Sequence, residues 1–132
     1  MKNQELLFKS AIQLASLIKN GQTTSLQTVT AFLEHIEKHN PKIHAVNTLR
    51  RKQALLEAKE ADRAVLAQEP LGPLHGVPMT IKDAFRVKGI LSTFGALPQY
   101  RFHFPKTDCK LVQRLREAGA NLQSVLGKWK RY

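Results

Sequence analysis

The feature that most constrains the fold is the stretch LGPLHGVPMTIKD at residues 71–83, where turn residues are followed at once by an alternating apolar run. Val77, Met79 and Ile81 would share one face of an extended chain. A strand this short buries its apolar face only by joining a sheet. The sequence therefore predicts a sheet-containing fold with a strand over residues 77–82, which ends in the charged residues Lys82 and Asp83.

The segment after this strand predicts a second strand that lies parallel to it. Thr107 or Asp108 can cap a helix over residues 108–118, and Gly119 would end that helix. The residues ANLQSVLG that follow favour a strand over residues 120–126. A strand, a helix and a strand in this order normally place parallel strands side by side. The helix side chains that we expect to face the core are Leu111, Val112 and Leu115.

The first half of the chain has a helical pattern. Apolar spacing predicts three helices before residue 70, the third with a thin apolar face that would pack on the surface of another part of the protein. The second helix would begin at a cap formed by Thr24 or Ser25 and end at Asn40-Pro41. Together with the strands, these helices predict the α/β class. They would cover residues 5–19, 24–40 and 49–68, with a short extended link over 43–48.

The composition limits the function classes. With 132 residues, of which 42% are hydrophobic, the chain can form one compact domain. A single cysteine, Cys109, excludes an internal disulfide, and no Cys or His cluster has metal-ligand spacing, so no metal or other cofactor is expected. The N-terminus lacks the apolar core of a signal peptide, and no stretch approaches the ~20 apolar residues that span a bilayer. We therefore expect a cytoplasmic protein with no membrane partner.

The formal net charge of +11 raises nucleic acid as a partner. Residues 101–132 hold 8 basic and 2 acidic residues, together with Trp129 and Tyr132. Phosphate contacts and base stacking would make this segment a nucleic-acid-binding module. Basic helix faces are usually just solvated, so this alternative is the least favoured.

Lys82 has two interpretations when it is taken alone. Its aliphatic stem can pack while the ammonium reaches solvent or pairs with Asp83, which is the commoner situation at the end of a strand. A buried lysine can instead lose its proton, because burial disfavours the charged form, and then act as a base toward a hydroxyl nucleophile.

The run GPLHGVPMTIKDAFRVKGILSTFG, with PKTDCKLVQRLREAGA after it, resembles the N-terminal part of the amidase signature family. The first two helices and the NPKIHAV link at 40–46 resemble that family's entry segment, so the resemblance covers roughly residues 5–121. Family members hydrolyse or transfer carboxamides with a serine nucleophile, a second serine in a cis peptide bond that relays protons, and a lysine base. Lys82 occupies the lysine of the family's G-[IV]-P-x-x-[IV]-K-D pattern, here Gly76 to Asp83.

The resemblance implies that Lys82 is the catalytic base, that the substrate is a small amide, and that helices pack on the first strands of a mixed sheet. The GPLHG variant and the STFG continuation look more like general amidases than like the amidotransferase subunits that amidate mischarged tRNA. Smaller roles are expected nearby. His75 and Gly76 would shape the turn into the strand, Asp83 would position its neighbours, and Ser92 and Thr93 would cap a local backbone.

The resemblance breaks down near the C-terminus. The family continues into a glycine- and serine-rich segment that supplies both serines, whereas this sequence reads AGANLQSVLGKWKRY and stops. We expect the match to fail after Leu122, and the chain to be a truncated amidase domain that is inactive alone. Its parts would be N-terminal helices over 5–70, the start of the amidase core over 71–122, and a divergent basic tail over 123–132. The serines present, none of them in a Gly-Ser-Ser-Gly context, are Ser10, Ser16, Ser25, Ser92 and Ser124.

A second alternative keeps the enzyme but divides it between two polypeptides. The chain would then be one half of a split amidase, and a separately encoded, complementing C-terminal chain would supply the serines that residues 1–132 lack in the required context.

Overall fold

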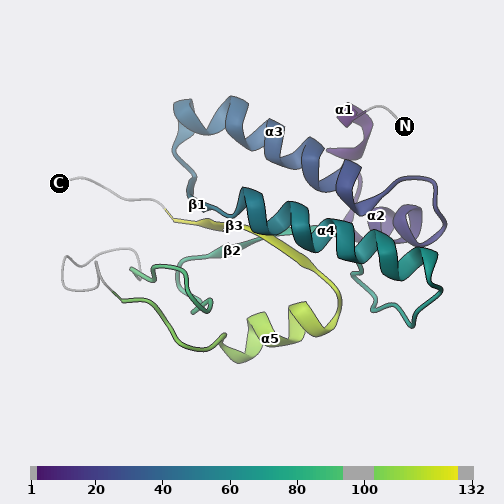
Figure 1. Cartoon of the computed structure of the whole chain (residues 1–132). Coiled ribbons are helices and arrows are strands. Elements are labelled where there is room, and N and C mark those ends of the chain that lie inside the picture. Colours follow the sequence, from purple (N-terminus) through teal and green to yellow (C-terminus); the bar gives the residue numbers. More distant parts are fainter. Residues whose placement is uncertain (1–2, 94–102, 128–132) are drawn as a thin grey trace.

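The centre of the fold is a three-stranded mixed sheet with helices on both faces (Figure 1). The coordinates are a computed structural model, which describes residues 3–93 and 103–127. The central strand β3 (Asn121–Leu126) pairs in parallel with β2 (Pro78–Lys82) and antiparallel with β1 (Val46–Leu49). The predicted α/β class and the parallel pairing of the two later strands are confirmed.

Helix α5 (Lys110–Glu117) covers one face of the sheet. Its buried Val112 packs with Ile81 of β2 and with Leu122 and Val125 of β3. A fully buried aliphatic side chain contributes about 1.5–3 kcal/mol, so this cluster is a main source of stability for the β2–α5–β3 unit.

The start of α5 differs from the prediction. Its N-cap is Cys109, which makes no side-chain cap hydrogen bond. The Asp108 carboxylate instead accepts from the Lys88 N–H at 2.7 Å and from Arg116 Nε at 2.9 Å, so it holds the preceding loop. Leu111, which we expected to face inward, is 41% exposed.

Helices α4 (Arg51–Leu66) and α3 (Ser25–Ile43) cover the other face, with α4 against β3 and α3 packed on α4 (Figure 1). Ala54 and Ala58 of α4 are fully buried against Val29 and Leu33 of α3. The expected thin apolar face of α4 is confirmed, and its small side chains let the two helices approach closely.

The N-terminal cap of α3 is confirmed and its predicted end is wrong. Thr24 Oγ1 accepts from the Gln27 N–H at 2.9 Å. The helix runs past Pro41 and ends at Ile43, and its C-cap is His44, which has a φ of 48°. Proline removes one helix donor, but the His44 N–H still bonds the Asn40 carbonyl at 2.7 Å and closes the last turn.

The single helix predicted over 5–19 is two helices, α1 (Asn3–Leu6) and α2 (Ala11–Lys19). Ser10 interrupts the pattern as the N-cap of α2. Its Oγ accepts from the Gln13 N–H at 3.2 Å, and Gln13 Oε1 accepts from the Ser10 N–H at 2.8 Å. This reciprocal capping box satisfies two backbone donors that a continuous helix would have paired internally. Leu6 of α1 still packs with Ile18 of α2 and with Val77 before β2.

Candidate functional site

Lys82 is the last residue of β2, and its backbone lies opposite Leu126 of β3. Its side chain is exposed, and it takes part in none of the ion pairs that the described residues form. Residues 3–93 and 103–127 therefore present the amine to solvent at the carboxyl end of β2. The burial that would favour a neutral, proton-accepting amine is not supplied by this part of the chain.

Asp83, in contrast, is buried, with 4% of its surface exposed. Its N–H donates to the Leu126 carbonyl at 2.7 Å, which extends the β2–β3 ladder by one bond. Its carboxylate accepts from the Thr93 N–H at 3.0 Å and also from the Thr93 hydroxyl. A buried carboxylate needs such donors, so Asp83 ties the loop after β2 to the end of the sheet.

The turn that leads into β2 is fixed by close backbone contacts. The Gly76 N–H donates to the Gly119 carbonyl at 2.9 Å, and His75 Nε2 lies 2.8 Å from the Ala61 carbonyl oxygen. Gly76 has a φ of 71°, and a Cβ placed there would meet Ser25 Oγ at 2.8 Å. Both conditions require glycine, so the first residue of the lysine motif is set by packing against α3.

Two serine hydroxyls of the described residues have clear structural roles. Ser10 caps α2, and the buried Ser25 donates from its hydroxyl to the Gly76 carbonyl at 2.7 Å. Ser92 is buried in the loop after β2, where its N–H donates to the His103 carbonyl at 2.9 Å. The sequence holds no Gly-Ser-Ser-Gly segment.

The central strand carries buried polar groups that the sequence did not flag. Asn121 Oδ1, Gln123 Oε1 and Ser124 Oγ are buried and have no hydrogen-bond partner among the described residues. The ladder shifts register here, because Met79 faces Leu122 while Thr80 faces Ser124, which leaves Gln123 as an inserted residue. Unpaired buried polar groups cost stability, so these three side chains make β3 the weak point of the sheet among the described residues.

A carboxylate from α4 completes the N-terminus of α3. Asp62 accepts from the Ser25 N–H at 2.6 Å and from the Leu26 N–H at 3.0 Å. The acceptor lies 37 residues from the first donor, so no local sequence signal could have found it. The negative charge of Asp62 also interacts favourably with the positive, N-terminal end of the α3 dipole.

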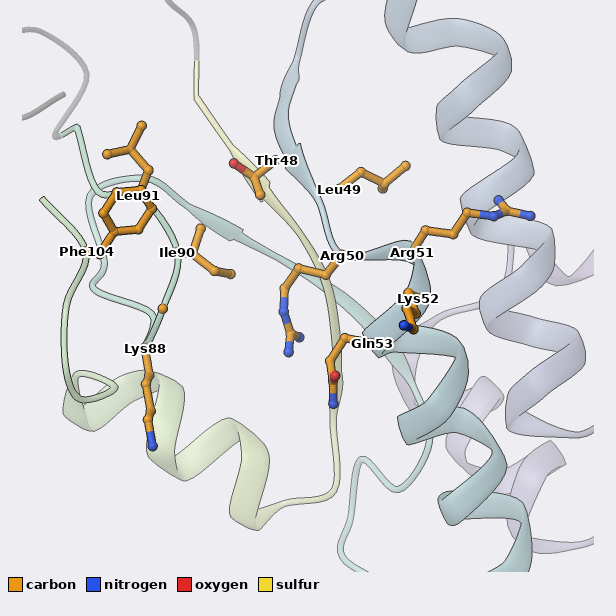
Figure 2. Close-up of a pocket in the computed structure, with 11 residues that line it drawn as sticks. Thr48, Leu49, Arg50, Arg51, Lys52, Gln53, Lys88, Ile90, Leu91 and Phe104 are labelled. Carbon is orange, nitrogen blue, oxygen red and sulfur yellow. The ribbon is translucent and has the colours of Figure 1, made fainter. Parts of the chain in front are cut away.

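An open groove of about 690 Å³ lies between the start of α4 and the loop after β2 (Figure 2). Two of its cationic side chains already form ion pairs. Arg50 pairs with Glu57 at 3.0 Å, and Arg51 pairs with Glu37 at 2.8 Å. Lys82 is not among its lining residues, so this groove is not the site that the lysine motif predicts. The lining residues are Thr48, Leu49, Arg50, Arg51, Lys52, Gln53, Lys88, Gly89, Ile90, Leu91 and Phe104.

Comparison with known proteins decides the family. The sequence profile of the amidase family (Amidase) matches residues 27–124, which include the whole lysine motif. The chain belongs to the amidase family. It is 37% identical over 121 residues to a glutamyl-tRNA(Gln) amidotransferase subunit from Salinispora tropica, covering 90% of this chain and 23% of that protein. It is 35% identical over 119 residues to an acylamidase from Rhodococcus erythropolis, covering 90% and 25%.

Solved structures show the same relationship. The native peptide amidase from Stenotrophomonas maltophilia superposes with a TM-score of 0.76 at 33% identity, covering 92% of this chain and 24% of that one. A fatty acid amide hydrolase gives a TM-score of 0.87 over 94% of this chain and 22% of its own, and at 22% identity it shows the fold alone. The predicted amidase-signature fold is confirmed.

These amidase relatives are longer than the chain, which spans about a quarter of their length. A share of about a quarter is what we expect for a portion of an amidase. The matches do not favour the alternative of a nucleic-acid-binding module. Amidotransferase subunits and an acylamidase match at similar identity, so the preference for general amidases stays a prediction. The role of Lys82 and the boundaries at residues 70 and 122 also stay predictions.

The described residues form neither a large metal-binding cluster nor a membrane span. Among residues 3–93 and 103–127, no group of three or more His, Cys, Asp or Glu side chains is placed to hold a metal ion. No helix in the same part of the chain is long and apolar enough to cross a bilayer.

Proposed function

We propose that this chain contributes the lysine base of an amidase, which hydrolyses the C–N bond of a small carboxamide. The observation that carries the proposal is the placement of the family's lysine motif, with Lys82 accessible at the end of β2 while Asp83 is buried beside it. Packing and hydrogen bonds hold the residues around the motif in place. The amine of Lys82, the side chain of the motif that can act as a base, is left exposed.

The proposed chemistry needs groups that residues 1–132 do not hold in the right context. A lysine base takes a proton from a hydroxyl, and the hydroxyl oxygen attacks the amide carbon while backbone donors stabilise the developing oxyanion. The C–N bond then breaks, the amine leaves with that proton, and water hydrolyses the acyl-enzyme to release the acid and restore the hydroxyl. In the proposed enzyme a relay serine lies between Lys82 and the nucleophilic serine. Both serines would come from polypeptide outside residues 1–132, so the chain alone is expected to be inactive.

A second polypeptide segment that covers Lys82 would also change the environment of its amine. The amine is exposed and β2 is an edge strand among the described residues, so a second segment that packs there would remove both the amine and the strand edge from water. Withdrawal from water disfavours the charged amine and so favours its action as a base. A complementing chain is therefore proposed as the partner, in keeping with the word subunit in the name of one relative.

A chimaera tests the role of Lys82 directly. Residues 1–122 of this chain would replace the aligned quarter of the Rhodococcus erythropolis acylamidase, to which the chain is 35% identical. The chimaera should hydrolyse simple aryl and aliphatic amides, and Lys82→Ala should abolish turnover while leaving the protein folded by circular dichroism. Lys88→Ala, which removes another exposed lysine on the following loop, is the matched control and should keep activity.

The isolated chain is the second arm of this experiment. Purified residues 1–132 should give no amide hydrolysis above background. A folded, active chimaera that tolerates Lys82→Ala would overturn the assignment of the base, and turnover by the isolated chain would overturn its dependence on a second polypeptide.

A further inference from the structure

The surface of α3 carries two histidines at positions that repeat one helical turn apart. His35 and His39 are separated by four residues, and their ring centroids lie 4.4 Å apart. Residues four apart share one helix face, so both imidazoles project from the same stripe. Both side chains are exposed, and α3 is an outer helix of the fold (Figure 1).

We propose that His35 and His39 form a surface chelate site for a divalent transition metal. Imidazole nitrogens bind Cu²⁺, Ni²⁺ and Zn²⁺ well, with metal–nitrogen bonds of about 2.0–2.1 Å for zinc. The ring centroids lie 4.4 Å apart and the ring planes are tilted by 43°, so the imidazoles are close enough for side-chain rotation to bring one nitrogen of each to a common ion. Water or a second donor would fill the other coordination positions.

The helix preorganises this pair of ligands. α3 runs for 19 residues, and the histidines lie well inside it, between its Thr24 cap and its end at Ile43. Once one imidazole has bound the ion, the other is held at high effective concentration, so the pair binds more tightly than either alone. His75, by comparison, is engaged by the Ala61 carbonyl and half-buried, so it is not available as a surface ligand.

The neighbouring charges set the strength and selectivity of the site. Lys38 and Lys42 act electrostatically on His39 and would repel a cation, while Glu37 on the same helix is paired with Arg51. With two imidazoles as its protein ligands, the site should be weak and should not bind Mg²⁺ or Ca²⁺, which need oxygen donors. Cu²⁺ should bind more tightly than Ni²⁺ or Zn²⁺, in the order usual for nitrogen sites.

Calorimetric titration of the untagged chain, residues 1–132, with Ni²⁺ tests the proposal. We expect one ion per chain, and an affinity that falls about tenfold or more in both His35→Asn and His39→Asn, because each removes the chelate. The matched control is His44→Asn, which removes an exposed imidazole at a left-handed position that asparagine tolerates. Cys109→Ser controls for binding by the thiol, and both controls should keep the wild-type affinity.

Cu²⁺ provides a second readout that does not depend on affinity. The electron paramagnetic resonance spectrum of the wild-type complex should show two equivalent imidazole nitrogens, and that of His39→Asn should show one. An unchanged Ni²⁺ affinity in either histidine variant, an equal loss in His44→Asn, or a single-nitrogen wild-type spectrum would each overturn the site. Because the substituted residues are exposed on the helix surface, far-ultraviolet circular dichroism should show unchanged helix content in every variant.

Discussion

Replacing Asp83 by alanine should destabilise the fold strongly. The change removes two hydrogen bonds to a buried carboxylate, one from the Thr93 N–H at 3.0 Å and one from the Thr93 hydroxyl. Hydrogen bonds to charged groups contribute about 1.5–3 kcal/mol each, so the free energy of unfolding should fall by about 3 kcal/mol or more. For a chain of this size that corresponds to a drop in melting temperature of roughly 10 °C. Urea unfolding followed by circular dichroism measures the difference.

The neighbouring lysine supplies the control for Asp83. Lys82→Ala removes an exposed side chain and should change stability by no more than about 0.5 kcal/mol. A double-mutant cycle between Asp83→Asn and Thr93→Val then isolates the coupling of the pair, which should be about 1 kcal/mol or more. A coupling near zero, or a cost for Asp83→Ala as small as that for Lys82→Ala, would refute the structural role of the carboxylate.

Three further outcomes follow from other contacts. Asp62→Asn should cost about 1–3 kcal/mol in urea unfolding, since it weakens two charge-assisted bonds at the start of α3. Gly76→Ala should destabilise clearly more than Gly89→Ala in thermal unfolding, because both have positive φ but only Gly76 has close neighbours. The pKa of His39 is lowered by partial desolvation and by the charges of His35, Lys38 and Lys42, so Lys38→Gln should raise it in a proton NMR titration. Because the folded-state pKa is depressed, the contribution of His39 to stability is present above the unfolded value and is lost as the pH falls through the folded value.

Two errors of the sequence interpretation, both in where a helix begins, have a common physical cause. Apolar spacing predicted one helix over 5–19, but the capping box of Ser10 and Gln13 offered the backbone a better local arrangement. Asp108 fitted a helix cap, yet in the fold its carboxylate bonds Lys88 and Arg116. In both cases side-chain hydrogen bonds, which periodicity does not report, decided where a helix begins.

The sequence by itself determined the α/β class, the parallel β2–α5–β3 unit and the motif that runs from Gly76 to Asp83. Those features depend on residues close together in the chain: the alternation of apolar residues in strands, their helical spacing, and the glycines that end helices or form turns. Only the tertiary structure decided that Asp83 is buried against Thr93 while Lys82 is exposed, since burial depends on which distant segments cover a side chain. The same holds for Asp62, because a carboxylate can stabilise a helix 37 residues away only after packing has brought the two together.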